Sequence, residues 1–352
     1  MTFLRPARVG LILALAGIAA GLAAADVAAR PKPVPVIEPP PPPPPMPDIG
    51  MSQRLIGEAA AFEDYMRKSA LISPAFTDAA GVQQSLRAGV AYQPAQFGRG
   101  EVAYAALAAL QDPTFVEAVR AAGQTPEQRY DVVRGIFASP SYALAFKDAA
   151  GAAGLAKEAL IGEGMRLFDA GKAVSLAAYS IQHQPWSLKD VPAREERLAA
   201  VKTLSASPRV ADPDVTLTMQ RAASGQPALG LAADPAPPPY TPLIVRAVAL
   251  AALAAIGQAG DDKLANISWL TDDYFTDHCL SHAKNELNVC LSVAKPNYED
   301  VFCLGEHALN STGICVVQGA GGAVPLEILN TPLLNIPPYH HRPAAHARRR
   351  RT

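Results

Sequence analysis

The sequence predicts an all-α protein in which an array of short helices precedes a disulfide-stapled helical hairpin domain. Several short oxygen-bearing side chains stand directly before a proline, a pattern typical of helix starts. Alanine- and leucine-rich stretches lie between them, and no stretch alternates apolar and polar residues as strands do. All four cysteines fall between Cys279 and Cys315. Aromatic residues make up only 6 % of the chain, which disfavours large β-barrels and sandwiches.

Residues 1–25 have the pattern of a signal peptide. Arg5 and Arg8 precede the uncharged, apolar stretch 11–25, which ends in small alanines suited to a cleavage site. This stretch falls short of the roughly 18–20 residues that span a bilayer. We therefore expect cleavage and a location in the bacterial periplasm or outside the cell. The alternative is an uncleaved anchor in the inner membrane.

Two proline-rich linkers, 26–50 and 227–240, divide the rest of the chain. Proline fixes φ and removes a backbone donor, so the first linker should form a semi-rigid polyproline II spacer. The linkers leave a helical region at 51–226 and a C-terminal helical domain at 241–325. The formal net charge of −1 indicates no overall attraction to nucleic acid.

Residues 51–226 should form short helices joined by brief turns. A side-chain oxygen can accept from the free N–H groups of a helix start, and proline fits the first helical position. Thr125 also has Gln128 three residues later, which is the spacing of a capping box. The predicted starts are Ser73-Pro74, Asp112-Pro113, Thr125-Pro126, Ser139-Pro140, Ser207-Pro208 and Asp212-Pro213.

An internal duplication of roughly 70 residues is a further expectation for this region. Three short stretches recur in the same order and at similar offsets, which exceeds what an alanine-rich composition would give by accident. The matching pairs are 76–81 with 146–151, 97–100 with 168–171, and 127–140 with 195–208.

The helical region shows no known catalytic motif. Glu58, Glu63 and Asp64 could form an acid pair, but carboxylates among arginines and lysines on a helix usually lie on a solvated face. The segment 183–186 could line a pocket, although a packed loop is the simpler interpretation. The glycines at 319–322 precede no helix-like stretch, so they indicate a turn rather than a phosphate-binding loop.

In the C-terminal domain, the apolar stretch 242–256 predicts a buried core helix that follows Thr241-Pro242. The even number of clustered cysteines in an exported chain predicts two structural disulfides. The stretch 278–295 should be a helix, on which Cys279 and Cys290 share one face about 16 Å apart. That separation is too large for a disulfide between them.

The stretch 298–309 should return as a second helix that ends at 311–313. An antiparallel hairpin of these helices favours the nested pairing Cys290–Cys303 with Cys279–Cys315. The crossed pairing, Cys279–Cys303 with Cys290–Cys315, is the alternative. Metal binding or redox chemistry at His278, Cys279 and His282, with Cys290 nearby, competes with both, although no Cys-x-x-Cys motif supports it.

The tail at 326–352 is rich in proline and arginine, and we expect it to be disordered. It is either a solubilising end or an electrostatic tether to anionic envelope polymers or lipid headgroups. The tether would consist of Arg342, Arg348, Arg349, Arg350 and Arg351.

Taken together, these patterns predict an exported, non-enzymatic binding or scaffolding component of the bacterial cell envelope. We expect no cofactor, no bound metal and no nucleic-acid partner. The expected partner is an envelope protein or an anionic envelope polymer. A periplasmic cell-wall hydrolase with a carboxylate pair is one alternative, and the C-terminal metal-binding or redox module is the other.

Overall fold

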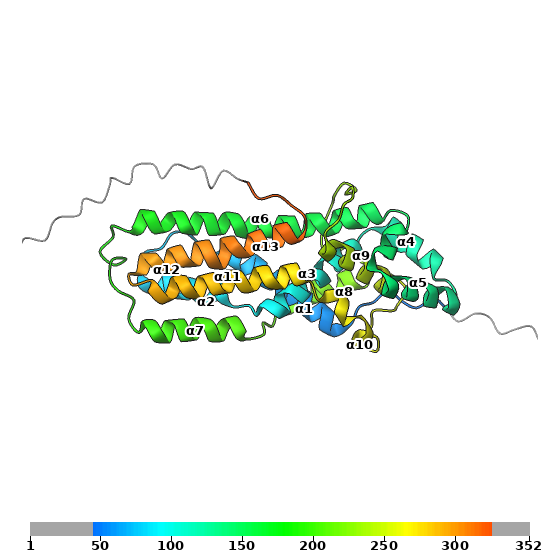
Figure 1. The fold of residues 1–352 in the computed structure, drawn as a ribbon, viewed down its shortest axis with the longest axis horizontal. Coiled ribbons are helices and arrows are strands. Elements are labelled where there is room, and N and C mark those ends of the chain that lie inside the picture. Colours follow the sequence, from blue (N-terminus) through cyan, green and yellow to red (C-terminus); the bar gives the residue numbers. More distant parts are fainter. Residues whose placement is uncertain (1–44, 326–352) are drawn as a thin grey trace, which may run out of the picture. The chain divides into compact units, whose positions relative to one another are not determined.

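The computed structural model describes residues 45–325, and these form an all-α fold (Figure 1). Among these residues, extended pairing is limited to two isolated bridges. The α-helices are α1 (Gln53–Ala70), α2 (Ala79–Val90), α3 (Pro94–Ala109), α4 (Pro113–Ala122), α5 (Pro126–Ala138), α6 (Ala149–Ile181), α7 (Arg194–Ala206), α8 (Pro213–Ala223), α9 (Pro242–Ala255), α10 (Leu264–Ile267), α11 (Tyr274–Val293), α12 (Asn297–Cys303) and α13 (Ser311–Gly319). Two 3₁₀ turns, η1 (Pro140–Ala145) and η2 (Ser268–Thr271), and a π-helical segment, η3 (Leu304–Asn310), complete the list.

Three of the six predicted helix starts, at Asp112, Thr125 and Asp212, are confirmed. Asp112 and Thr125 cap α4 and α5 through their side chains, and Thr125 forms the predicted capping box with Gln128. Asp212 precedes α8, and Ser139 precedes only the 3₁₀ turn η1.

Two predicted starts, at Ser73 and Ser207, are wrong. The Ser73 hydroxyl accepts from the Ala75 N–H in a local turn, and the next helix begins only after Asp78. The Ser207 hydroxyl donates backwards to the Thr203 carbonyl, so this serine ends α7 instead of starting a new helix.

Helix α6 contradicts the expectation of short helices throughout. It runs for 33 residues because no proline interrupts 149–181. In the first predicted repeat, Pro94 separates α2 from α3 over the stretch that aligns with this one helix. The two segments therefore differ in structure, and the duplication stays a prediction.

The core lies where α1, α3, α6 and α9 pack together. Helix α9 is buried along almost its whole length, which confirms the predicted core helix. It packs against α3, and α13 packs against α6 (Figure 1). Helices from both sides of the 227–240 linker therefore share one core.

Glycines allow α6 to approach the C-terminal helices closely. A Cβ atom on Gly171 would lie 2.4 Å from the Asn310 backbone nitrogen in η3. A Cβ on Gly313 of α13 would lie 2.6 Å from the Phe168 nitrogen in α6. Both separations are far below van der Waals contact, so the two backbones can touch only because these positions lack side chains.

The C-terminal helices form the predicted hairpin with two disulfides. Cys279 bonds to Cys315 and Cys290 bonds to Cys303, each with 5.7 Å between Cα atoms, which is the nested pairing. The predicted end of the second helix at 311–313 is wrong. Gly313 packs against α6 without breaking the helix, which continues through η3 and α13 to Gly319.

The predicted signal peptide, most of the first linker and the basic tail lie outside the described residues. Among the described helices, none combines the length and apolar character needed to cross a membrane.

Candidate functional site

A polar cleft lies between α1, α3, α6 and α8 and has a volume of about 400 Å³. We call it the α1–α6–α8 cleft. Loop residues 228–231 close one side of it. Its charged and hydroxyl-bearing lining is unusual in a protein body built largely from alanine and leucine, and the volume suits a small ligand. The polar lining residues are Glu63, Arg67, Tyr104, Glu158, Glu163, Arg166 and Thr218.

Glu63 of α1 is one of three glutamates that line the cleft. Its Oε2 atom is buried and has no hydrogen-bond partner among the described residues. Burial raises the pKa of the Glu63 carboxyl, and the charges of Arg166 and Arg67 and the Tyr104 hydroxyl oppose this shift only in part. Glu63 therefore keeps its proton to a higher pH than an ordinary glutamate.

Glu163 of α6 also lines the cleft, and only about 5 % of it is exposed. Its carboxylate forms an ion pair with Arg166 one turn further along α6. Tyr104 of α3 lines the cleft as well, and burial raises the pKa of its hydroxyl well above the ordinary value. Tyr104 therefore remains a neutral hydrogen-bonding group at physiological pH.

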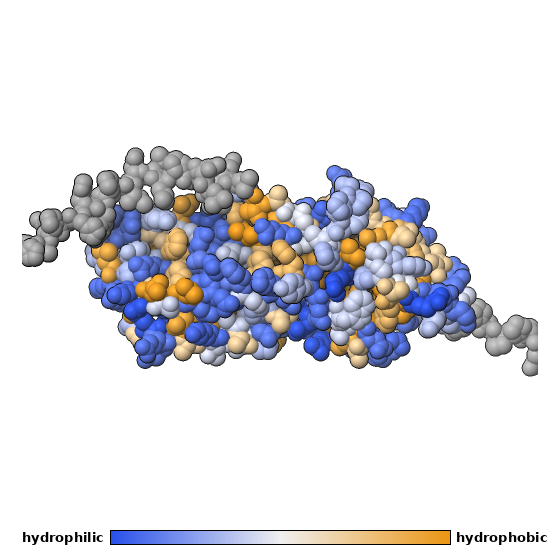
Figure 2. All heavy atoms as spheres, in the orientation of Figure 1, coloured by the Kyte–Doolittle hydropathy of each residue, from blue (hydrophilic) through white to orange (hydrophobic). Residues whose placement is uncertain are grey.

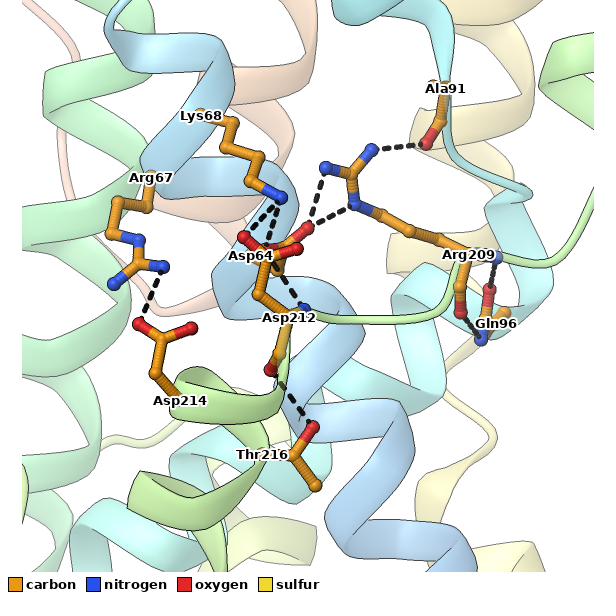
Figure 3. A network of polar contacts seen from close by, with 9 residues as sticks. All are labelled: Asp64, Arg67, Lys68, Ala91, Gln96, Arg209, Asp212, Asp214 and Thr216. Atoms are coloured by element: carbon orange, nitrogen blue, oxygen red, sulfur yellow. Dashed lines mark hydrogen bonds and ion pairs between the residues drawn. The ribbon is translucent and has the colours of Figure 1, made fainter.

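A second polar network holds α8 against α1 (Figure 3). The buried Asp64 carboxylate pairs with Lys68 at 2.9 Å and with Arg209 at 2.6 Å. Lys68 also pairs with Asp212 at 2.8 Å, directly before the first residue of α8. Burial opposes ionisation of Asp64, but hydrogen bonds from Lys68 and Arg209 bring its pKa below the ordinary value. The network thereby fixes the α8 wall of the cleft.

Arg67 links the cleft to this network. It lines the cleft and forms an ion pair with Asp214 in the first turn of α8, at 3.4 Å (Figure 3). Within the cleft, the positive charges of Arg67 and Arg166 are thus both engaged by carboxylates.

The expected solvated face for Glu58, Glu63 and Asp64 is wrong. Glu58 and Asp64 are buried, and Glu63 is half-buried in the cleft. Arginine partners make burial possible, since Arg99 pairs with Glu58 at 2.9 Å as Arg209 does with Asp64. The three carboxyls also separate: only Glu63 lines the cleft, and its neighbour there is Glu163 rather than Glu58 or Asp64.

The other sequence candidates lie away from this cleft. Residues 183–186 form a turn after α6. The glycines at 319–322 lie at the end of α13, and its last residue is Gly319. The possible tether, which consists of Arg342, Arg348, Arg349, Arg350 and Arg351, lies outside the described residues.

His278 and His282 line a separate pocket of about 310 Å³ beside the Cys279–Cys315 disulfide. All four cysteines are bonded in disulfides, so their sulfurs supply no thiolate to a metal. Within residues 45–325, no group of three or more histidine, cysteine, aspartate or glutamate side chains is placed to hold a metal ion.

One sequence signal does point to Glu163, which our sequence analysis did not identify. It occupies the same helical stripe as Leu160, Gly164 and Leu167, all of which are buried. A charged residue on an apolar stripe is unusual and marks a candidate site.

Comparisons with protein-family models, curated proteins and solved structures find no match to this chain.

Proposed function

We propose that this protein is an exported, non-enzymatic binding component of the bacterial cell envelope and that the α1–α6–α8 cleft holds its ligand. Two disulfides are typical of proteins that work in oxidising, extracytoplasmic surroundings. The observation that carries the proposal is a cleft of small-molecule size that is lined by three glutamates, Glu63, Glu158 and Glu163.

The charges of the cleft favour a ligand rich in hydrogen-bond donors. Arg67 and Arg166 are engaged by carboxylates, whereas Glu63 and Glu158 form no ion pair with any arginine or lysine in the part of the chain that the structure describes. Hydroxyl and ammonium groups complement such oxygens. A cell-wall glycan that carries hydroxyls and peptide amines presents this chemistry in the proposed compartment.

The face drawn in Figure 2 also favours a small-ligand cleft over a broad apolar interface. On the face drawn in Figure 2, apolar side chains form small, separate groups within a mostly hydrophilic surface. Broad protein–protein interfaces usually require larger contiguous apolar patches.

The test is co-sedimentation of the purified, disulfide-bonded protein with peptidoglycan sacculi. Glu63→Gln should weaken binding by about tenfold, because a charge-assisted hydrogen bond is lost. Glu195→Gln is the matched control, since this glutamate is exposed in the first turn of α7 and distant in sequence from the cleft residues. Equal binding by the wild type and Glu63→Gln would contradict the proposal.

A cell-wall hydrolase is the second candidate, and the position of Glu63 and Glu163 in one cleft favours it. Glu63, with its raised pKa, would protonate the leaving oxygen, while Glu163 would accept a proton from the attacking water. The Arg166 contact occupies the Glu163 carboxylate, which makes binding the better supported function. Hydrolysis would be established instead if the wild type released reducing ends from sacculi and both Glu63→Gln and Glu163→Gln abolished this release.

The tether formed by the tail arginines is a separate proposal that rests on the sequence. Deletion of 342–352 should lower retention of the protein in the envelope fraction, and added salt should weaken retention of the intact chain. Retention that is unchanged by the deletion at low salt would contradict it.

A further inference from the structure

A small pocket of about 180 Å³ lies between the C-terminal end of α6 and helix α12, and three of its six lining residues are aromatic. We call it the α6–α12 pocket. The two helices pack together at one end of the fold (Figure 1). Aromatic residues make up only 6 % of the chain, so this concentration of rings at one site is unusual. The lining residues are Ala178, Tyr179, Gln182, Tyr298, Glu299 and Phe302.

The rings of the pocket are accessible to a ligand. Tyr179 is 43 % exposed, and Tyr298 and Phe302 are half-buried. The Tyr179 and Phe302 rings meet at 79°, with 6.2 Å between their centroids. Two rings at nearly a right angle can form adjoining walls of a box, and a group seated in the corner lies within about 6 Å of both centroids, which is the range of cation–π contact.

The pocket is negative in charge. Glu299 is its only carboxyl group, and no arginine, lysine or histidine lines it. The Glu299 Oε2 atom accepts the Lys295 backbone N–H at 2.8 Å, and the carboxylate forms no ion pair with a side chain in residues 45–325. Each aromatic ring adds negative potential at its face. The pocket therefore attracts a cation and repels an anion.

The α12 wall of the pocket is held at both ends. At its start, the Tyr298 N–H donates to the Ser187 carbonyl at 3.3 Å. At its end, Cys303 directly follows Phe302 and is bonded to Cys290 of α11. The rings on this wall are therefore in place before a ligand binds, which lowers the entropic cost of binding.

We propose that the α6–α12 pocket binds a quaternary ammonium group, such as the trimethylammonium head of choline. Its methyl groups pack against the rings, and its positive charge is attracted by the ring faces and by the Glu299 carboxylate. A quaternary ammonium has no N–H group that needs an acceptor, which suits walls made largely of aromatic carbon. The pocket shares no residue with the α1–α6–α8 cleft, so it is a second site whatever the cleft binds.

The experiment uses the full, disulfide-bonded chain with ¹³C-labelled aromatic rings, and the probe is choline chloride at constant ionic strength. The ring resonances of Tyr179 and Phe302 should shift saturably as choline is added. Tyr179→Leu should weaken binding about tenfold, because one wall of the box is lost. Tyr142→Leu is the matched control and should bind as the wild type does. Tyr142 is 42 % exposed and also meets a phenylalanine ring, that of Phe146, at nearly a right angle, but it does not line the pocket.

A neutral probe of the same shape tests the role of charge. Dimethylbutanol, in which carbon replaces the ammonium nitrogen of choline, should bind about tenfold more weakly. Glu299→Gln should weaken choline binding about threefold and leave the binding of the alcohol unchanged. Equal binding of choline and the alcohol, or no saturable shift below about 10 mM choline, would overturn the proposal. Tighter binding of N-acetylglucosamine at the same resonances would also overturn it, because the pocket would then be a sugar site.

Trimethylammonium groups occur in small solutes and in lipid headgroups, and a second arm of the experiment separates these sources. Co-sedimentation with phosphatidylcholine vesicles, abolished by free choline and absent with phosphatidylglycerol vesicles, would support the proposal with a lipid headgroup as the ligand. Choline binding without co-sedimentation would support it with a free solute as the ligand.

Discussion

Gly171→Ala tests the close packing of α6 on the C-terminal helices. The added Cβ would lie 2.4 Å from the Asn310 nitrogen, 2.7 Å from its Cα and 2.8 Å from its Cβ. Ordinary contacts are 3.4–4 Å, so the helices must separate by about 1 Å. Because most of the clashing atoms are backbone, no side-chain rotation can relieve the clash.

The expected cost of this overpacking is about 1–3 kcal/mol. The gain in helix propensity from glycine to alanine offsets up to about 1 kcal/mol of it. The melting temperature should fall by about 2–4 °C for each kcal/mol of net loss in a protein of this size. Calorimetric or circular-dichroism melts of the disulfide-bonded protein provide the assay.

Gly162→Ala is the matched control on the same helix. A Cβ there would meet only the Arg166 Nη1 atom, at 3.8 Å. This variant should be more stable than the wild type by about 0.4–1 kcal/mol. If Gly171→Ala were as stable as Gly162→Ala, the described contact between α6 and η3 would be wrong.

Two further predictions concern a buried acid and the disulfides. Burial, with the charges of nearby aspartates, raises the pKa of Glu101, whose oxygens have no hydrogen-bond partner among the described residues. The folded state therefore keeps this proton to a higher pH than the unfolded chain does. As the pH rises from the ordinary glutamate pKa towards the pKa of Glu101 in the folded state, the free energy of unfolding falls. Glu101→Gln should remove this pH dependence. In urea unfolding, the free energy of unfolding of the variant should therefore exceed that of the wild type by more at pH 8 than at pH 5. An equal difference at the two pH values would contradict the account. Replacement of Cys290–Cys303, with a sequence separation of 13, by serines should cost about 3 kcal/mol of unfolding free energy, and replacement of Cys279–Cys315, with a separation of 36, about 4 kcal/mol. The reverse order in denaturant unfolding would show that loop closure is not the dominant effect.

Local signals predicted much of the fold. Thr125 and Asp112 cap the helices that follow them because capping depends on only three or four neighbouring residues. Helix geometry excluded a bond between Cys279 and Cys290, and an antiparallel hairpin favoured the nested pairing but left the crossed one open; the structure shows the nested pairing. Ser207 failed because its hydroxyl had an equally local partner in the preceding helix.

The cleft could not be predicted because it depends on contacts between distant segments. Glu63 and Glu163 come from α1 and α6 and meet only through helix packing. The sequence alone could not distinguish Glu63 from Asp64, since they are adjacent and differ only in the face of α1 that they occupy. Glu63 faces the cleft, and Asp64 faces Arg209 in the loop before α8.

The most direct measurement for the binding role is the affinity for soluble peptidoglycan fragments as a function of pH, for the wild type and Glu63→Gln. We predict that wild-type affinity rises with pH above the ordinary glutamate range, because Glu63 loses its proton and gains an acceptor for the ligand's donors. The variant should bind more weakly and with a flat profile. Parallel profiles of equal affinity would contradict the assignment of the α1–α6–α8 cleft as the ligand site.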